Sequence, residues 1–196
     1  MERTYLFIDG SNLYGGQYEL FGPEEYLDFT QFIKLLEKEL TIHFNKIYFY
    51  ASYSPIPIKP TRKQKLYLKN EALFYRSVKK TPNTVFFTGY RSKTSGKEKE
   101  VDVKLTADLV SFAFLDRFDT AYLCTGDADF LQALFSIRQY HNKKKMYLLC
   151  LENKIMFQGL FHFTTYVVIL KKKPVLKKQY RNLKFLEIKA IDVINK

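Results

Sequence analysis

Short apolar runs rich in aromatic and β-branched residues alternate with longer amphipathic patterns along this chain, and this alternation constrains the fold more than any other feature. Five of the runs predict strands, at residues 4–8, 45–51, 84–88, 119–124 and 145–151. The segments between them have the apolar spacing of helices, at residues 28–41, 62–79, 100–115 and 128–140. Strands that alternate with helices of this length are typical of right-handed βαβ units, so we expect an α/β fold with a parallel sheet.

The pattern weakens after the fifth of these strands. Residues 152–163 are compatible with a short helix, and residues 164–170 (TTYVVIL) predict a sixth strand. Residues 171–184 hold seven basic residues and no acidic one, and the stretch after them permits a helix or a strand. A length of 196 residues suits one domain. We therefore expect one domain over residues 1–170 and a basic C-terminal extension over residues 171–196.

The charge balance restricts the class of partner. A net charge of +12 and a pI near 9.5 indicate a polyanionic partner, most simply nucleic acid. A protein that binds a membrane surface is the competing interpretation, but no stretch approaches the roughly 18 apolar residues that span a bilayer. The N-terminal MERTYLFIDG enters a strand directly and does not resemble a signal peptide. Cys124 and Cys150 lie in apolar runs without zinc-site spacing, so we expect buried reduced thiols in a cytoplasmic protein.

Acidic residues stand where the predicted strands end. Asp9 ends the first strand, and Asp127 and Asp129 follow the fourth strand in the segment TGDADF. Asp102 falls in the first turn of the helix predicted at 100–115, which begins at the same edge of a parallel sheet. Like charges gathered in one region repel unless a cation or shared protons offset them. Carboxylate oxygens without nearby His or Cys suit Mg²⁺ or Mn²⁺.

Each of these residues also has a simpler local interpretation. Asp9 could start a turn, Asp127 could cap the helix that follows, and Asp102 could complement the dipole of its own helix. Taken singly, the local interpretation is the simpler one, but capping does not require all of them at one edge of the sheet. Asp108 is ambiguous, because it is either half-buried behind the acidic residues or paired with Lys104.

Motifs of other enzyme classes are missing from the sequence. The glycines after the first strand do not form GxGxxG, and no Walker GxxxxGK[ST] occurs, so a nucleotide cofactor loses support. His43, His141 and His162 are scattered and suggest neither a catalytic triad nor an HExxH site. Asp9 at the end of the first strand also fits a phosphatase of the haloacid dehalogenase type. That class needs a second Asp two residues later, where this chain has Ser11.

Three segments, FIDGSNLY, KEVDVKLTADLV and CTGDADFLQAL, resemble in this order the signature segments of NYN domains, which belong to the PIN-like ribonuclease superfamily. The LabA/DUF88-like branch is the most similar, and the resemblance covers roughly residues 4–151. It implies a three-layer α/β/α, Rossmann-like domain with a central, mainly parallel sheet of about five or six strands. It also implies an acidic metal-binding cleft that hydrolyses RNA phosphodiesters. By position, the acidic site maps onto Asp9, Asp102, Asp127 and Asp129, and the polar residue after the first strand maps onto Asn12. Glu100 stands where the family usually has glycine.

The sequence and the resemblance together predict a nuclease, most simply an endoribonuclease, that uses Mg²⁺ or Mn²⁺ held by these carboxylates. Asn12 would hydrogen-bond a phosphate oxygen or a water. The polar segment 91–100 is expected to be a flexible basic loop beside the site, and the residues expected to bind the RNA backbone are Arg91, Lys93, Lys97, Lys99 and Lys104. Exposed aromatic rings would stack bases of single-stranded or structured RNA. We expect no membrane partner, and a homodimer is a further hypothesis. The alternatives are a module that binds nucleic acid without cutting it and, less simply, a phosphatase on a doubly wound fold.

Overall fold

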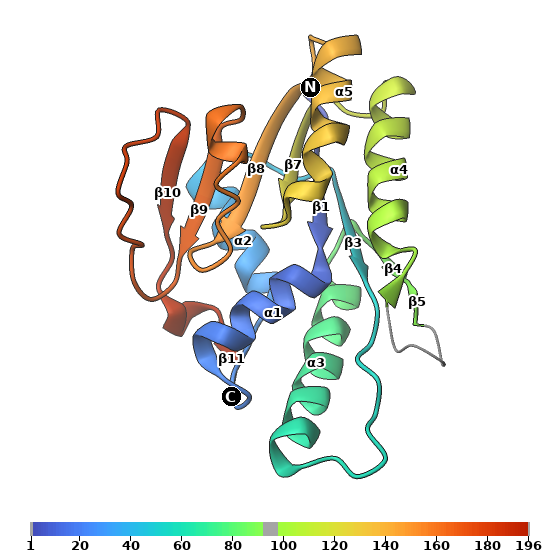
Figure 1. Ribbon diagram of the computed structural model, residues 1–196, viewed down its shortest axis with the longest axis vertical. Coiled ribbons are helices and arrows are strands. Elements are labelled where there is room, and N and C mark those ends of the chain that lie inside the picture. Colours follow the sequence, from blue (N-terminus) through green and yellow to red (C-terminus); the bar gives the residue numbers. More distant parts are fainter. Residues whose placement is uncertain (1, 92–97, 196) are drawn as a thin grey trace.

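A seven-stranded sheet forms the centre of the molecule in a computed structural model that describes residues 2–91 and 98–195. Its strand order is β10-β9-β8-β7-β1-β3-β4, and all six neighbouring pairs are parallel (Figure 1). The strands are β1 (Thr4–Asp9), β3 (Lys46–Ala51), β4 (Thr84–Thr88), β7 (Thr120–Cys124), β8 (Lys145–Leu151), β9 (Thr165–Ile169) and β10 (Leu183–Glu187). The expected mainly parallel sheet is confirmed, with one strand more than expected.

Helices cover both faces of the sheet, which gives the expected three layers. One apolar cluster joins the sheet to α1 (Gly10–Phe21), α2 (Phe29–Leu40) and α3 (Arg62–Lys80). A second cluster on the other face joins the sheet to α4 (Val101–Phe114) and α5 (Leu131–Tyr140). The alternation of inward side chains explains the division, because Leu6 and Ile8 belong to the first cluster and Phe7 to the second.

The predicted strands and helices are confirmed, and the structure adds the helix α1, which the sequence pattern did not predict. The chain does not turn at Gly10; it enters a twelve-residue helix directly after Asp9. A Cβ atom at Gly10 would lie 2.2 Å from a ring carbon of Phe49, so this close approach requires glycine. Residues 152–163 contain only the 3₁₀ turn η2 (Gly159–Phe161) in place of the short helix that was considered.

Smaller elements complete the fold. Two antiparallel ladders join β2 (Tyr26–Leu27) to β11 (Ile194–Asn195) and β5 (Tyr90–Arg91) to β6 (Glu98–Lys99). Two further 3₁₀ turns are η1 (Ala128–Phe130) and η3 (Ala190–Asp192). Part of the segment expected to be an extension therefore forms strand β10 at the edge of the central sheet. None of the helices in the described part of the chain has an apolar stretch long enough to cross a membrane.

The connections after β1 and β7 diverge, and this fixes where a ligand site can lie. From β1 the chain adds β3 and β4 on one side of the sheet, then returns across it so that β7 pairs with the other side of β1. In open α/β sheets, ligands bind in the crevice outside the carboxyl ends of strands at such a switch point. The topology therefore selects the ends of β1 and β7.

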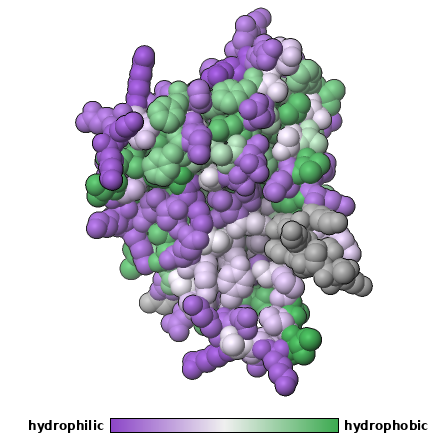
Figure 2. All heavy atoms as spheres, viewed as in Figure 1, coloured by the Kyte–Doolittle hydropathy of each residue, from purple (hydrophilic) through white to green (hydrophobic). Residues whose placement is uncertain are grey.

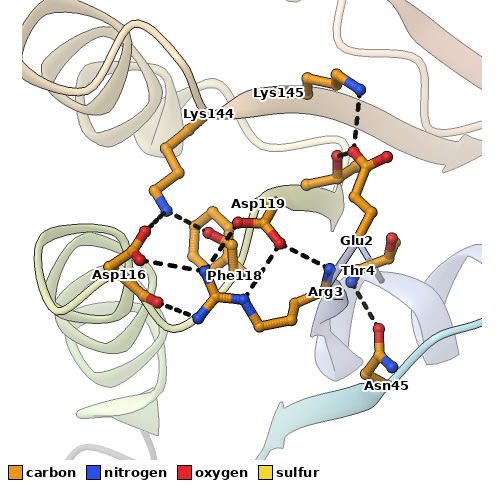
Figure 3. Close-up of polar contacts among 10 residues, drawn as sticks. Glu2, Arg3, Thr4, Asn45, Asp116, Phe118, Asp119, Lys144 and Lys145 are labelled. Carbon is orange, nitrogen blue, oxygen red and sulfur yellow. Dashed lines mark hydrogen bonds and ion pairs between the residues drawn. The ribbon is translucent and has the colours of Figure 1, made fainter.

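An ion-pair cluster fastens the N-terminal segment at the opposite end of the sheet (Figure 3). The guanidinium of Arg3 donates to both carboxylate oxygens of Asp119, at 2.8 and 3.1 Å, and also contacts Asp116. Lys144 contacts Asp116 as well. Hydrogen bonds from Arg3 hold the pKa of the Asp119 carboxyl well below its usual range. These charged side chains pair with one another and hold the N-terminal segment in place. The candidate site lies at the opposite end of the sheet.

Candidate functional site

Asp9 uses its two carboxylate oxygens in two directions. Its Oδ1 accepts a hydrogen bond from the backbone N–H of Asn12 at 3.0 Å, which caps helix α1. Its Oδ2 accepts a hydrogen bond from the hydroxyl of Thr125, which follows strand β7, at 3.0 Å. The side chain is buried, with 6% of Asp9 exposed. The local capping interpretation of Asp9 is therefore confirmed, and its second oxygen contacts the segment after β7, while its role in a functional site stays a prediction.

The segments after β1 and β7 are tied together by further hydrogen bonds. The Oδ1 atom of Asn12 accepts from the backbone N–H of Gly126 at 3.0 Å, across the two segments. The Thr125 hydroxyl oxygen also accepts from the backbone N–H of Asp127 at 3.1 Å. One hydroxyl thus connects Asp9 to the segment that carries Asp127. The segments that carry Asp9, Asn12 and Asp127 therefore adjoin at the switch point, while the gathering of the carboxylates of Asp9, Asp102, Asp127 and Asp129 into one site stays a prediction.

Asp127 and Asp129 are exposed beyond this junction. Oδ1 of Asp127 accepts from the backbone N–H of Asp129 at 3.0 Å and caps the turn η1. The predicted capping role of Asp127 is confirmed in this form. Because Asp127 is exposed at the carboxyl edge of the sheet, its carboxylate can meet a ligand from solvent.

Helix α4 carries the remaining acidic candidates. Asp102 is exposed in its first turn, and Figure 1 shows this turn at the same end of the sheet as the end of β1. Asp108 is half-buried and forms an ion pair with Lys104 at 2.6 Å, so that predicted pairing is confirmed. Asp108 also accepts a hydrogen bond from the hydroxyl of Tyr50, the residue that pairs with Asp9 in the sheet. Burial and the Asp108 carboxylate raise the pKa of Tyr50 well above its usual range.

The expected RNA-contacting residues have different outcomes. Lys104 lies beside Asp108, which partly neutralises its charge. Lys93 and Lys97, like the rest of 92–97 within the expected basic loop, lie outside the described residues. The backbones of Arg91 and Lys99 lie in the β5–β6 ladder. Their role in binding RNA stays a prediction.

Two residues that the sequence analysis missed organise this edge of the sheet. Thr125 makes the contact between Asp9 and the segment after β7. Glu152, directly after β8, is buried and accepts the backbone N–H groups of Leu170, Lys171 and Lys172. Both are polar residues directly after a buried parallel strand, as Asp9 is at the end of β1. A search of the sequence for polar residues at the end of every predicted strand would have identified them.

The oxygen donors of this site fit a magnesium-like cation. Within the described ranges 2–91 and 98–195, no three His, Cys, Asp or Glu side chains are grouped so that they could hold a metal ion. Mg²⁺, however, commonly binds through one or two carboxylates, keeps several waters and takes further oxygens from substrate phosphates. The carboxylates of Asp9 and Asp127 are donors of this kind, and Thr125 links the carboxylate of Asp9 to the backbone N–H of Asp127. Cys124 and Cys150 are buried free thiols as predicted, and burial raises the pKa of Cys150 to about 12, so neither suits a nucleophile.

Comparisons with known proteins agree with this fold. A crystal structure of a protein of unknown function from Vibrio parahaemolyticus is similar, with a TM-score of 0.60 and 18% identity, over 87% of this chain and 94% of that chain. At this identity the likeness shows a shared fold. No curated protein matches the chain. The sequence model of the NYN domain matches residues 3–170, which include both strands and all the acidic residues of the site. The chain therefore belongs to the NYN domain family.

Proposed function

We propose that this protein is a metal-dependent ribonuclease that hydrolyses RNA phosphodiester bonds at the junction of β1 and β7. The observation that carries the proposal is the hydrogen-bonded junction itself, in which Thr125 joins buried Asp9 to the segment of Asp127. Membership of a nuclease-like family and the net charge of +12 support a nucleic-acid substrate.

The chain's own residues have separate roles in this proposal. Asp9 and Asp127 would hold one or two Mg²⁺ or Mn²⁺ ions, with Asp102 in the first turn of α4 and Asp129 in η1 as further carboxylates. A bound divalent cation supplies Lewis acidity, which activates water and offsets charge on the transferring phosphoryl group. Asn12 fixes the position of the segment after β7 through the Gly126 amide, and its side-chain NH₂ group can donate to a phosphate oxygen.

A module that binds nucleic acid without cutting it is the second candidate. It is favoured by one observation, that no three metal-ligating side chains are grouped in the described part of the chain. Against it stands the acidic character of the junction. Carboxylates repel phosphates, so a surface that only bound RNA would gain nothing from Asp9 and Asp127 at this place.

The experiment compares Asp127→Asn with Asp28→Asn, using RNA cleavage with Mg²⁺ or Mn²⁺ as the assay. Asp28 caps α2 through the same kind of bond, from the Gln31 amide, but belongs to another part of the fold. Asparagine caps helices as well as aspartate does, so both variants should stay folded. Residues that only support metal ligands cost about 10- to 100-fold in activity when they are replaced. We expect the cleavage rate of Asp127→Asn to fall by more than this. Equal rates for both variants and the wild type would reject the assignment.

A second measurement does not depend on activity. A cation that binds only the folded chain raises its thermal stability. We expect Mn²⁺ to raise the melting temperature of the wild type and of Asp28→Asn, and to raise that of Asp127→Asn less. RNA binding without any Mn²⁺-dependent shift or cleavage would favour the module that binds without cutting.

A further inference from the structure

The basic segment 171–184 begins at the carboxyl edge of the sheet and returns to the amino end of β10, where Asn182 accepts a hydrogen bond from the first residue of β9. Glu152 accepts three consecutive backbone N–H groups where the segment begins, those of Leu170, Lys171 and Lys172, at 2.7 to 3.1 Å. The segment then runs along the edge strand β10 and enters it at Leu183 (Figure 1). Its path is therefore fixed at both ends by the fold.

The ammonium groups of this segment are not neutralised by carboxylates. Glu152 binds backbone amides only, and no lysine or arginine of 171–184 forms an ion pair with any residue that the structure describes. Lys173 and Lys184 instead lie over the rings of Phe185 and Tyr166, at 4.2 and 5.4 Å from the ring centroids. Seven basic residues with no acidic one thus form an uncompensated positive surface.

Aromatic rings line a furrow along the same segment. A hollow of about 380 Å³ is lined by residues that include Lys173, Lys178, Tyr180 and Phe185. Two more hollows share Lys178 and Tyr180 with it and extend it to Phe157 and Phe161. Figure 2 shows apolar and hydrophilic side chains side by side at the edge where Figure 1 places the segment. Interleaved cations and rings are the composition of surfaces that bind single-stranded nucleic acid.

Two of these rings are available for stacking. Phe161 is 62% exposed and Phe157 is 49% exposed, which is unusual for phenylalanine in a folded protein. Phe161 contacts the ring of Tyr180 edge-on, with centroids 5.4 Å apart, and this contact positions the ring while leaving much of its surface open.

The furrow connects to the acidic junction through the loop after β8. A Cβ atom at Gly126 would lie 2.4 Å from the backbone oxygen of Lys154, so the residue before Asp127 packs directly on this loop. The same loop begins with Glu152, which holds the start of the basic segment. Neighbouring strands are about 4.8 Å apart, and β9 ends three residues beyond the register position of Cys124, so the end of β9 lies about 14 Å from the end of β7. A strand of RNA at the junction can reach the basic segment across this distance.

We propose that residues 171–184, together with Phe157 and Phe161, form a docking surface for single-stranded RNA that extends the substrate from the acidic junction. The inference rests on the proposed function for the identity of the substrate. The surface binds the flanking strand through phosphate contacts and base stacking, and it adds affinity without taking part in the chemistry. The uncompensated charge selects a polyanion, and the open rings favour unpaired bases over an acidic membrane surface.

The experiment measures binding of a fluorescent oligouridylate by anisotropy, with the full chain in EDTA so that no cleavage occurs. The test variant carries Lys172→Glu, Lys177→Glu and Lys178→Glu. The matched control carries Lys63→Glu, Lys65→Glu and Lys69→Glu on α3, which are equally exposed and change the net charge by the same amount. We expect the test variant to bind at least about tenfold more weakly than the control. Its salt dependence should also fall, because each phosphate contact contributes about 0.7 to the slope for single strands.

Single-ring variants test stacking apart from charge. Phe161→Ala should weaken binding by about fivefold or more, the low end for one stacked base. Phe114→Ala, which removes an exposed ring from α4, should not. Equal weakening by both triple variants, or no effect of Phe161→Ala, would overturn the inference. Binding of the wild type to phosphatidylserine vesicles in place of oligouridylate would overturn it as well.

The outcome separates this inference from the proposed function. If the test variant loses RNA binding while the wild type shows no cleavage with Mg²⁺ or Mn²⁺, the surface stands and the nuclease proposal fails. If the wild type cleaves RNA and the test variant does so with unchanged KM, the nuclease proposal stands and the surface is wrong.

Discussion

Replacing Glu152 by alanine tests whether one buried carboxylate organises the edge of the sheet beside the site. Glu152 is 8% exposed and accepts the backbone N–H groups of residues 170, 171 and 172 at 2.7, 3.1 and 3.0 Å. The amide of Leu170 is buried, and leaving such a donor without an acceptor costs about 1–3 kcal/mol. The other two amides are part-buried, so water can replace some of their lost bonding. We expect the variant to lose about 2–5 kcal/mol of unfolding free energy.

The measurement is urea unfolding followed by far-ultraviolet circular dichroism, since the chain has no tryptophan to report by fluorescence. For a domain of this size, the loss corresponds to a fall in melting temperature of about 5–15 °C. Glu152→Gln keeps one acceptor oxygen but turns an NH₂ group toward a backbone N–H. Its unfolding free energy should therefore lie between those of the alanine variant and the wild type. Glu187→Ala removes an exposed carboxylate from β10 and serves as the control.

Local loosening gives a second readout for the same variant. Without Glu152, the start of segment 171–184 loses its anchor, and trypsin should cut within this lysine-rich stretch faster than in the wild type. An unfolding free energy equal to that of the wild type, with unchanged trypsin cleavage, would refute the reasoning about this carboxylate.

Four more substitutions and a pH series probe the backbone and the charges. Gly126→Ala should destabilise the fold by about 1–3 kcal/mol and impair cleavage, because its Cβ would press on a backbone oxygen of the loop after β8. Gly15→Ala should instead stabilise helix α1 by about 0.5–1 kcal/mol, because no atom lies within 4 Å of the added Cβ. Glu100→Gly should stabilise by about 1 kcal/mol in urea unfolding, since Glu100 has a φ of 75°, a left-handed conformation that glycine adopts freely. Stability should be full above about pH 4, the usual pKa of an unfolded aspartate, and should fall as the pH drops below it, because Arg3 lowers the pKa of Asp119 in the folded chain. In Asp119→Asn, the unfolding free energy should fall less below about pH 4, as measured by urea titrations at several pH values. An unchanged pH dependence would contradict the role of the Arg3–Asp119 pair.

The strands of the sheet were predictable because each is an apolar run that stands out from its neighbours. All six strands predicted from the sequence are present in the central sheet. From them, topology alone predicts which ends share an edge, and this brought Asp9 and Asp127 to one place without any contact being known. The lateral order of strands was not predictable in this way, although it is what makes β1 and β7 neighbours.

Helix α1 could not be predicted from apolar spacing, because much of its buried face is not apolar. Gly10, Gly16 and Gln17 are buried together with Leu13 and Tyr14. Gln17 is buried because its side-chain oxygen accepts the backbone N–H of Leu27, a contact with a distant segment that leaves no local signal. A helix built on close packing of glycine and on a buried hydrogen bond reads in the sequence as a turn.

Strand β10 was harder for a related reason. It carries Lys184 and Glu187 on an edge strand, where one side of the strand has no partner in the sheet and charged residues are tolerated. Such a strand lacks the continuous apolar run of a central parallel strand, and composition alone assigned it to an extension.

The two interpretations of Asp9 were framed as competitors because each assigns the whole side chain to one partner. A carboxylate has two oxygens, and here Oδ1 serves the helix while Oδ2 serves the other strand segment. The cap therefore has a consequence for the site: it restricts the rotation of the carboxylate and directs the second oxygen toward Thr125. A substitution that keeps the cap but removes the charge, Asp9→Asn, should preserve helix α1 and still abolish cation binding. A variant that kept helix α1 and still bound the cation would show that the charge is not needed, and capping would then be sufficient to explain why aspartate stands at this position.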